Sequence, residues 1–197
     1  MLVESPRIRV YPDFAKTTFL IYVLIASLAV FFLATFIAYT TRFIFGHQLV
    51  TGIARLPQLL WWSTGFLFLC SHFLFRAYAL VRREKQKQFR IALTISFLLG
   101  GLFCTVQTLG IAQLIDLHRE QAGIQPGAIA SVAFMVFLHV AHFAVGYIAL
   151  GYVLFQAYHG RYDHEYANGV RLAGIYWRFL DVIWLCMLLL FWLAAHY

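Results

Sequence analysis

The sequence predicts an all-α protein, an integral membrane bundle of five transmembrane helices. Of its 197 residues, 62% are apolar and only 12% are charged, whereas a soluble domain is about half apolar and about a quarter charged. The apolar residues form five stretches, and each is long enough to span a membrane, which takes roughly 20 residues. These observations exclude a soluble enzyme, a disordered tail and a secreted disulfide scaffold.

The first stretch, 17–40, would be about 36 Å long as a helix. That length crosses a hydrocarbon core of about 30 Å with some tilt. The stretch is too long for the core of a signal peptide and lacks a convincing cleavage site. We therefore expect it to belong to the mature protein as the first transmembrane helix.

The other four stretches cover about 58–80, 91–114, 128–157 and 174–195. Each is apolar nearly all round, unlike an amphipathic surface helix. The connections between the stretches are short, and none could form a second domain. Residues 1–197 are therefore expected to form a single transmembrane domain.

Lysine and arginine are distributed unequally over the connections, which predicts the orientation of the chain. One side carries 12 of these residues: Arg7, Arg9, Lys16, Arg76, Arg82, Arg83, Lys85, Lys87, Arg90, Arg161, Arg171 and Arg178. The other side carries 3: Arg42, Arg55 and Arg119. The N-terminus should therefore be cytoplasmic and the C-terminus periplasmic or outside. The formal net charge of +7 reflects this bias, and no nucleic-acid partner is expected.

Asp181 is the deepest carboxylate of the last stretch and needs a partner there, because a charge near the membrane centre is costly. Arg178 lies three residues before it, on the same helical face, and Trp177 and Trp184 flank it. We expect an ion pair between Arg178 and Asp181 that fixes helix packing. A proton or ion relay would need a chain of such groups, and no second deep carboxylate is evident.

His139, His142 and Gly146 lie on one stripe of the fourth stretch. Imidazoles there can form hydrogen bonds to other helices, which is the role that we expect. The alternative is a small membrane cytochrome, in which His72 and either His139 or His142 ligate a haem.

Uncharged polar residues of the second and third stretches are expected to hold helices together. They are Ser63, Thr64, Ser71, His72, Thr105, Gln107 and Thr108. The sequence contains no evident Ser-His-Asp arrangement, Gly-rich phosphate loop or deep acidic pair. We therefore expect no catalytic, cofactor-binding or metal-binding residues in this chain. Transport is not favoured either, since paired half-repeats and broken helices are not evident.

Several motifs, taken in order, carry a family resemblance. Residues 174–184 read Gly-Ile-Tyr-Trp-Arg-Phe-Leu-Asp-Val-Ile-Trp. This resembles the last-helix signature of haem–copper oxidase subunit III, roughly Tyr-Trp-His-Phe-apolar-Asp-apolar-apolar-Trp, with Arg178 in place of the His. Residues 137–146, Phe-Leu-His-Val-Ala-His-Phe-Ala-Val-Gly, resemble the family's penultimate helix. Residues 103–107, Phe-Cys-Thr-Val-Gln, are similar to the helix before that, and the stretch from Trp62 to Ser71 is a looser match to the preceding one.

The chain looks like the short five-helix form of this family, which lacks the first two helices of the seven-helix members. Two carboxylates that the family often has are missing. Ser27 is followed by Leu28, where a Glu is frequent, and Gly110 replaces a second Glu.

The resemblance implies a non-catalytic subunit III of a haem–copper terminal respiratory oxidase in a bacterial inner membrane. Such a subunit packs on the catalytic subunit I and stabilises it during oxygen reduction coupled to proton pumping in aerobic electron transport. Haem and copper are then expected in the partner subunit and none in this chain. Other oxidase subunits and membrane lipids are the remaining expected partners. An accessory subunit of a nitric oxide reductase is a further alternative, and the electron donor, cytochrome c or quinol, is left open.

Overall fold

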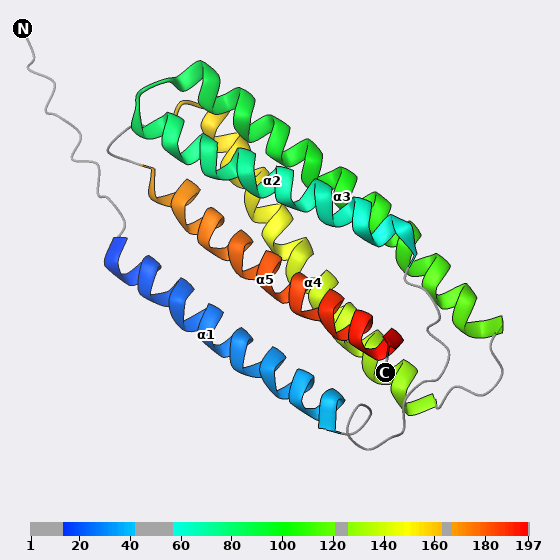
Figure 1. Ribbon diagram of the computed structural model, residues 1–197. Helices are drawn as coiled ribbons and strands as arrows, with labels where there is room; N and C mark the ends of the chain where they lie inside the picture. Colours follow the sequence, from blue (N-terminus) through cyan, green and yellow to red (C-terminus); the bar gives the residue numbers. More distant parts are fainter. Residues whose placement is uncertain (1–13, 42–56, 121–125, 163–166, 197) are drawn as a thin grey trace, which may run out of the picture.

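The structure, a computed structural model, describes residues 14–41, 57–120, 126–162 and 167–196. Within these ranges it is entirely helical and has five helices (Figure 1). They are α1 (Phe14–Tyr39), α2 (Gln58–Arg82), α3 (Gln86–Glu120), α4 (Pro126–Tyr158) and α5 (Asn168–His196). Each is long and apolar enough to cross a membrane. The predicted all-α bundle of five spanning helices is thereby confirmed.

The helices are longer than the apolar stretches on which they were predicted. α3 begins at Gln86, five residues before the expected start, and α5 begins at Asn168 in place of 174. The difference has a simple reason, since hydropathy marks only the part of a helix inside the hydrocarbon. The polar flanks continue the helix, because its backbone hydrogen bonds do not depend on side-chain polarity. Arg7, Arg9, Arg42, Arg55 and the C-terminal Tyr197 lie outside the described residues.

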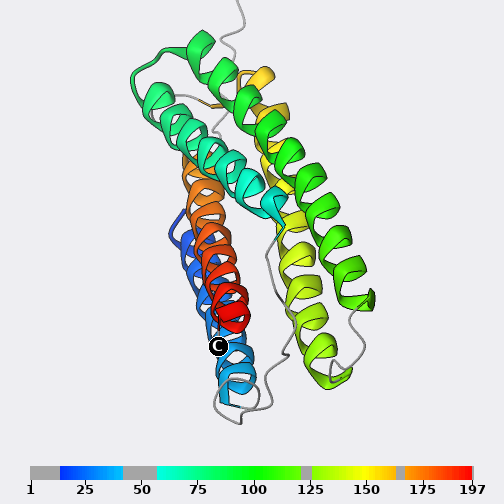
Figure 2. The same ribbon diagram turned by 45° about the vertical axis from the view of Figure 1, so that its right-hand side comes forward.

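A tight turn joins α2 to α3 and makes the two helices a hairpin. Lys85 N donates a hydrogen bond to Leu80 O and Glu84 N donates one to Val81 O, both 3.1 Å long. Glu84 takes a positive φ of 60°, which lets the chain reverse at once. The two helices lie side by side in both views (Figures 1 and 2).

The main core lies between α2, α3, α4 and α5, and α5 is the central helix. α5 contacts α1, α2 and α4, and half of its spanning window is buried. A second, smaller cluster joins α1 to α4 and α5. It consists of Phe32, Tyr39, Met135, Ile183, Met187 and Phe191. Figure 2 shows α5 with α1 beside it and the α2–α3 hairpin crossing over its other flank.

Candidate functional site

A buried polar contact joins α2 to α5 in the interior. Ser71 Oγ donates a hydrogen bond to Asp181 Oδ2, and Asp181 is only 5% exposed. Its second oxygen, Oδ1, has no hydrogen-bond partner among the described residues. The carboxylate is therefore held by a hydroxyl from another helix, which ties the centre of α5 to α2.

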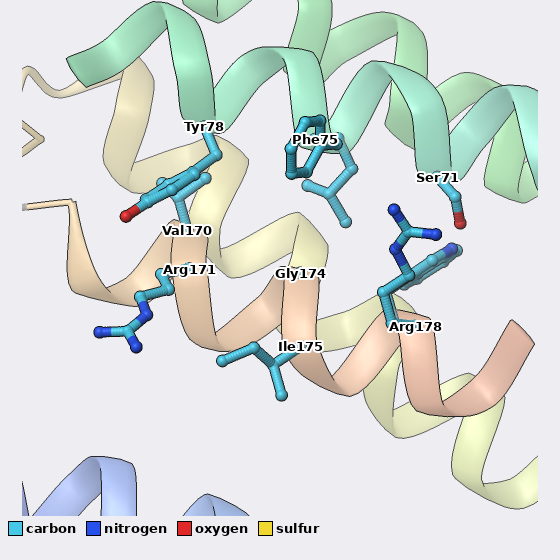
Figure 3. Close-up of a pocket in the computed structure, with 10 residues that line it drawn as sticks. Ser71, Phe75, Tyr78, Val170, Arg171, Gly174, Ile175 and Arg178 are labelled. Carbon is cyan, nitrogen blue, oxygen red and sulfur yellow. The ribbon is translucent and has the colours of Figure 1, made fainter. Parts of the chain in front are cut away.

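Arg178 occupies a different position from the one expected of an ion-pair partner. Its guanidinium carbon lies 6.0 Å from the centroid of the Phe75 ring, and the side chain is exposed. Figure 3 shows it turned toward α2, beside Ser71. Within the described residues, the hydrogen bond to Asp181 thus comes from Ser71, and Arg178 contributes only at longer range. Ser71, and not Arg178, bonds to Asp181 because the serine faces the carboxylate directly across the α2–α5 contact.

Trp184 makes the next contact between the same two helices. Its Nε1 donates a hydrogen bond of 3.0 Å to Thr64 Oγ1, and Thr64 Oγ1 in turn donates to Leu60 O at 2.7 Å. His139 of α4 packs against Trp184, with ring centroids 5.6 Å apart. The indole therefore lies between α2 and α4 and contacts both.

Gln107 and Ser63 join α3 to α2. Ser63 Oγ lies 2.6 Å from Gln107 Oε1 and donates to it, while Gln107 Nε2 has no partner among the described residues. A second hydroxyl contact lies further along the same interface, where Ser96 Oγ donates to Cys70 O at 3.0 Å. Gln107 thus lies at the contact between α3 and α2, and its structural role there stays a prediction.

Gly110 lets α3 approach α2 closely. A Cβ atom at Gly110 would lie 3.0 Å from Leu60 Cδ2 and 3.4 Å from Leu59 Cβ. The absence of a carboxylate here is therefore matched by a close contact between the two helices, which a longer side chain would separate.

His142 faces α1, whereas His139 faces α5. His142 Nδ1 donates to Leu138 O of its own helix at 2.6 Å, and its ring lies edge-on to Phe32 with centroids 5.7 Å apart. Tyr176 Oη donates to the backbone oxygen of His142 at 3.1 Å. The two histidines thus serve different helix contacts, although they lie three residues apart.

Gly146 and Trp177 shape the contact between α4 and α5. A Cβ atom at Gly146 would lie 2.9 Å from both Leu180 Cδ1 and Tyr176 Cε1. Trp177 is 2% exposed and packs on Phe143 with centroids 5.4 Å apart. Glycine at position 146 allows the two helices to approach closely without displacing the Leu180 and Tyr176 side chains.

The described residues contain no group of three His, Cys, Asp or Glu that could hold a metal ion. His139 Nδ1 has no hydrogen-bond partner among the described residues, and the His139 ring is buried and packs against Trp184. His72 is exposed on α2.

From the sequence we identified the residues of α4 and α5 that take part in these contacts, but not their partners on α2. Ser71 and Thr64 were grouped with other uncharged polar residues, without an assigned partner. A signal was present, because Thr64 and Ser71 are seven residues apart and therefore share one helix face. Together the contacts link all five helices and can hold them in register.

The chain is similar to curated proteins named "Probable quinol oxidase subunit 3", while no protein-family model matches it. The relative from Staphylococcus aureus (strain USA300) is 27% identical over 143 residues, which covers 71% of this chain and 68% of the relative. The relative from Staphylococcus saprophyticus subsp. saprophyticus is 26% identical over 142 residues, covering 72% and 69%.

Proposed function

We propose that this chain is the non-catalytic subunit III of a haem–copper terminal oxidase, an integral part of an aerobic respiratory complex. The observation that carries the proposal is the similarity to proteins named as quinol oxidase subunit 3, over about seven-tenths of both chains. The five spanning helices agree with a multi-pass subunit in a membrane.

The geometry of the interior supports a structural role within such a complex. Ser71, Thr64 and Gln107 are all engaged with side chains of neighbouring helices. Hydrogen bonds of this kind fix the relative positions of transmembrane helices. In the proposed complex, haem and copper are held by the catalytic subunit I, and this chain stabilises that subunit while oxygen is reduced and protons are pumped.

The proposed orientation has the N-terminus in the cytoplasm and the C-terminus outside, in a bacterial inner membrane. It rests on the excess of lysine and arginine on one side of the sequence, 12 against 3. Among the described residues, Arg82, Arg83 and Lys85 of that side lie at the turn between α2 and α3. The relatives' organisms are bacteria, which agrees with this location.

The experiment is to purify the tagged full-length chain from its native membranes in a mild detergent. We expect a large haem- and copper-containing subunit to co-purify, together with oxygen consumption driven by quinol or by cytochrome c. Recovery of only free or self-associated chain would contradict the proposal. A partner with haem but no copper would indicate a nitric oxide reductase, and a Soret band from the isolated chain would indicate a cytochrome.

A further inference from the structure

A groove of about 210 Å³ lies between α2 and α5. Figure 3 shows Arg171 toward one end of it and Arg178 beside Ser71 at the other. We call this feature the α2–α5 groove and the second end its Ser71 end. Trp177 also lines the groove. Because Ser71 donates its hydrogen bond to Asp181, the Ser71 end lies next to the buried carboxylate.

Two buried polar atoms of α5 near the Ser71 end have no hydrogen-bond partner among the described residues. They are the donor Trp177 Nε1 and the acceptor Asp181 Oδ1, on side chains that are 2% and 5% exposed. The two residues are four apart and therefore neighbours on one face of the helix. A buried donor or acceptor costs free energy when it has no partner. A molecule that accepts from the indole and donates to the carboxylate removes both costs.

Arg178 brings a third polar group to the same place. It precedes Asp181 by three residues and therefore lies on the adjacent turn, and its charge acts on the carboxylate. Its guanidinium carbon, however, lies 6.0 Å from the centroid of the Phe75 ring, and the described residues show no ion pair between Arg178 and Asp181. A polar interaction that is too long for a direct bond can be bridged by water.

The chemistry of these three groups selects the occupant. The indole and the guanidinium can only donate hydrogen bonds, whereas an ionised carboxylate can only accept them. An inorganic anion would suit the two donors, but the carboxylate would repel it. A metal ion would suit the carboxylate, but the guanidinium would repel it. A small neutral molecule that both donates and accepts fits all three groups, and water is such a molecule.

We propose that the Ser71 end of the α2–α5 groove binds an ordered water molecule. The water accepts hydrogen bonds from Trp177 Nε1 and the Arg178 guanidinium and donates one to Asp181 Oδ1. Buried waters make about three hydrogen bonds each, to groups that otherwise have no partner. Arg178 and Asp181 thus form an ion pair through water, beside the direct bond from Ser71. The proposal needs only the packing of α2 on α5 and does not depend on the oxidase role.

The test is solid-state NMR of the full-length chain in phosphatidylcholine bilayers, with ¹⁵N-labelled tryptophan. Transfer of magnetisation from water protons to each indole N–H is measured, and Trp177→Phe and Trp184→Phe identify the two signals. We expect a water cross-peak for Trp177. Trp184 is the internal control, because it is equally buried, 1% exposed, but its Nε1 donates to Thr64. It should give no such cross-peak.

Variants of the exposed arginines test which groups hold the water. Arg178→Met removes one donor and should weaken the Trp177 cross-peak by at least about three-fold, because the water loses a bond to a charged group. Arg178→Lys keeps a cationic donor and should keep most of the cross-peak. The matched control is Arg171→Met, at an exposed arginine toward the other end of the groove, about 10 Å away along α5. It should leave the cross-peak unchanged.

Three results would overturn the proposal. The first is a wild-type Trp177 signal without a water cross-peak, or one no stronger than that of Trp184. The second is an unchanged cross-peak in Arg178→Met, with an unshifted Trp184 signal as evidence that the variant is folded. The third is an equal loss in Arg171→Met, which would mean that water fills the groove generally and is not bound at the Ser71 end.

Discussion

α1 and α5 are both long and apolar enough to span a membrane, but they differ in how much of each helix is buried in the protein. The spanning window of α1 has the highest mean hydropathy, 2.7, and only 6% of it is buried in the protein. That of α5 has a mean hydropathy of 1.7, and 50% of it is buried. The more apolar helix is the peripheral one, which is the reverse of the pattern in a soluble protein.

The reversal follows from the solvent. Lipid accepts apolar side chains as readily as the protein interior does, so apolar character gives α1 no reason to be covered. Polar side chains on α5 find no partner in lipid and must be satisfied by other helices. On α1 the hydroxyls of Ser27 and Thr35 bond to their own helix, Ser27 Oγ to Val23 O at 2.9 Å and Thr35 Oγ1 to Phe32 O at 2.7 Å. On α5, Asp181 and Trp184 bond to α2.

The largest expected effect comes from removing the carboxylate of α5. Asp181→Ala leaves the Ser71 hydroxyl without its acceptor and Arg178 without a nearby anion. We expect a loss of about 2–4 kcal/mol in the free energy of unfolding, between the values for a hydrogen bond to a charged group and a broken buried pair. Unfolding in mixed micelles measures it, with Ser27→Ala on α1 as the control. Equal stability of both variants would remove the proposed difference between the helices.

Gly146→Val tests whether α4 must approach α5 as closely as it does. The new side chain would meet Leu180 and Tyr176, since even a Cβ atom lies 2.9 Å from each. Overpacking of this kind costs about 1–3 kcal/mol, measured as a lower melting temperature in detergent. Gly65→Val has open space around it and should melt like the wild type. A similar drop in the melting temperature of both variants would mean that the loss of a backbone glycine, and not the contact between α4 and α5, causes the effect.

Trp184→Phe tests the hydrogen bond between α5 and α2. It removes the bond to Thr64 and leaves a smaller ring between Phe103 and His139, so the single variant also loses packing. The hydrogen bond itself should contribute about 0.6 kcal/mol, the average for such bonds between membrane helices. A double-mutant cycle with Thr64→Val isolates it, and Trp62→Phe, at an exposed tryptophan, is the control. Zero coupling between positions 64 and 184 would show that the bond contributes nothing.

The smallest effect is expected on the exposed face of α1. Val30 is 69% exposed, so Val30→Leu exchanges one lipid-facing aliphatic side chain for another and should change stability by less than about 0.5 kcal/mol. The same unfolding assay applies. A loss comparable to that of Asp181→Ala would mean that this face of α1 is covered by protein, which would place a partner subunit there.

Part of the candidate site could be predicted from the sequence. Asp181 and Gln107 were expected to pack between helices because polar groups in apolar stretches need partners, and each has a contact on another helix. The expected partner of Asp181 was Arg178, because the spacing of residues along one helix is the only spatial closeness that can be read directly from a sequence. The observed partner, Ser71, is 110 residues away in the chain. It lies next to Asp181 because α2 crosses α5 at this point.

The sequence by itself determined that this protein has five spanning helices. The reason is local, since an apolar stretch in lipid can satisfy its backbone only by forming a helix. The tertiary structure alone decided that α5 is central, that α1 is peripheral, and that Arg171 and Arg178 line one groove. These outcomes depend on which helix faces meet, and such contacts join residues far apart in the chain through geometry that hydropathy and spacing do not encode.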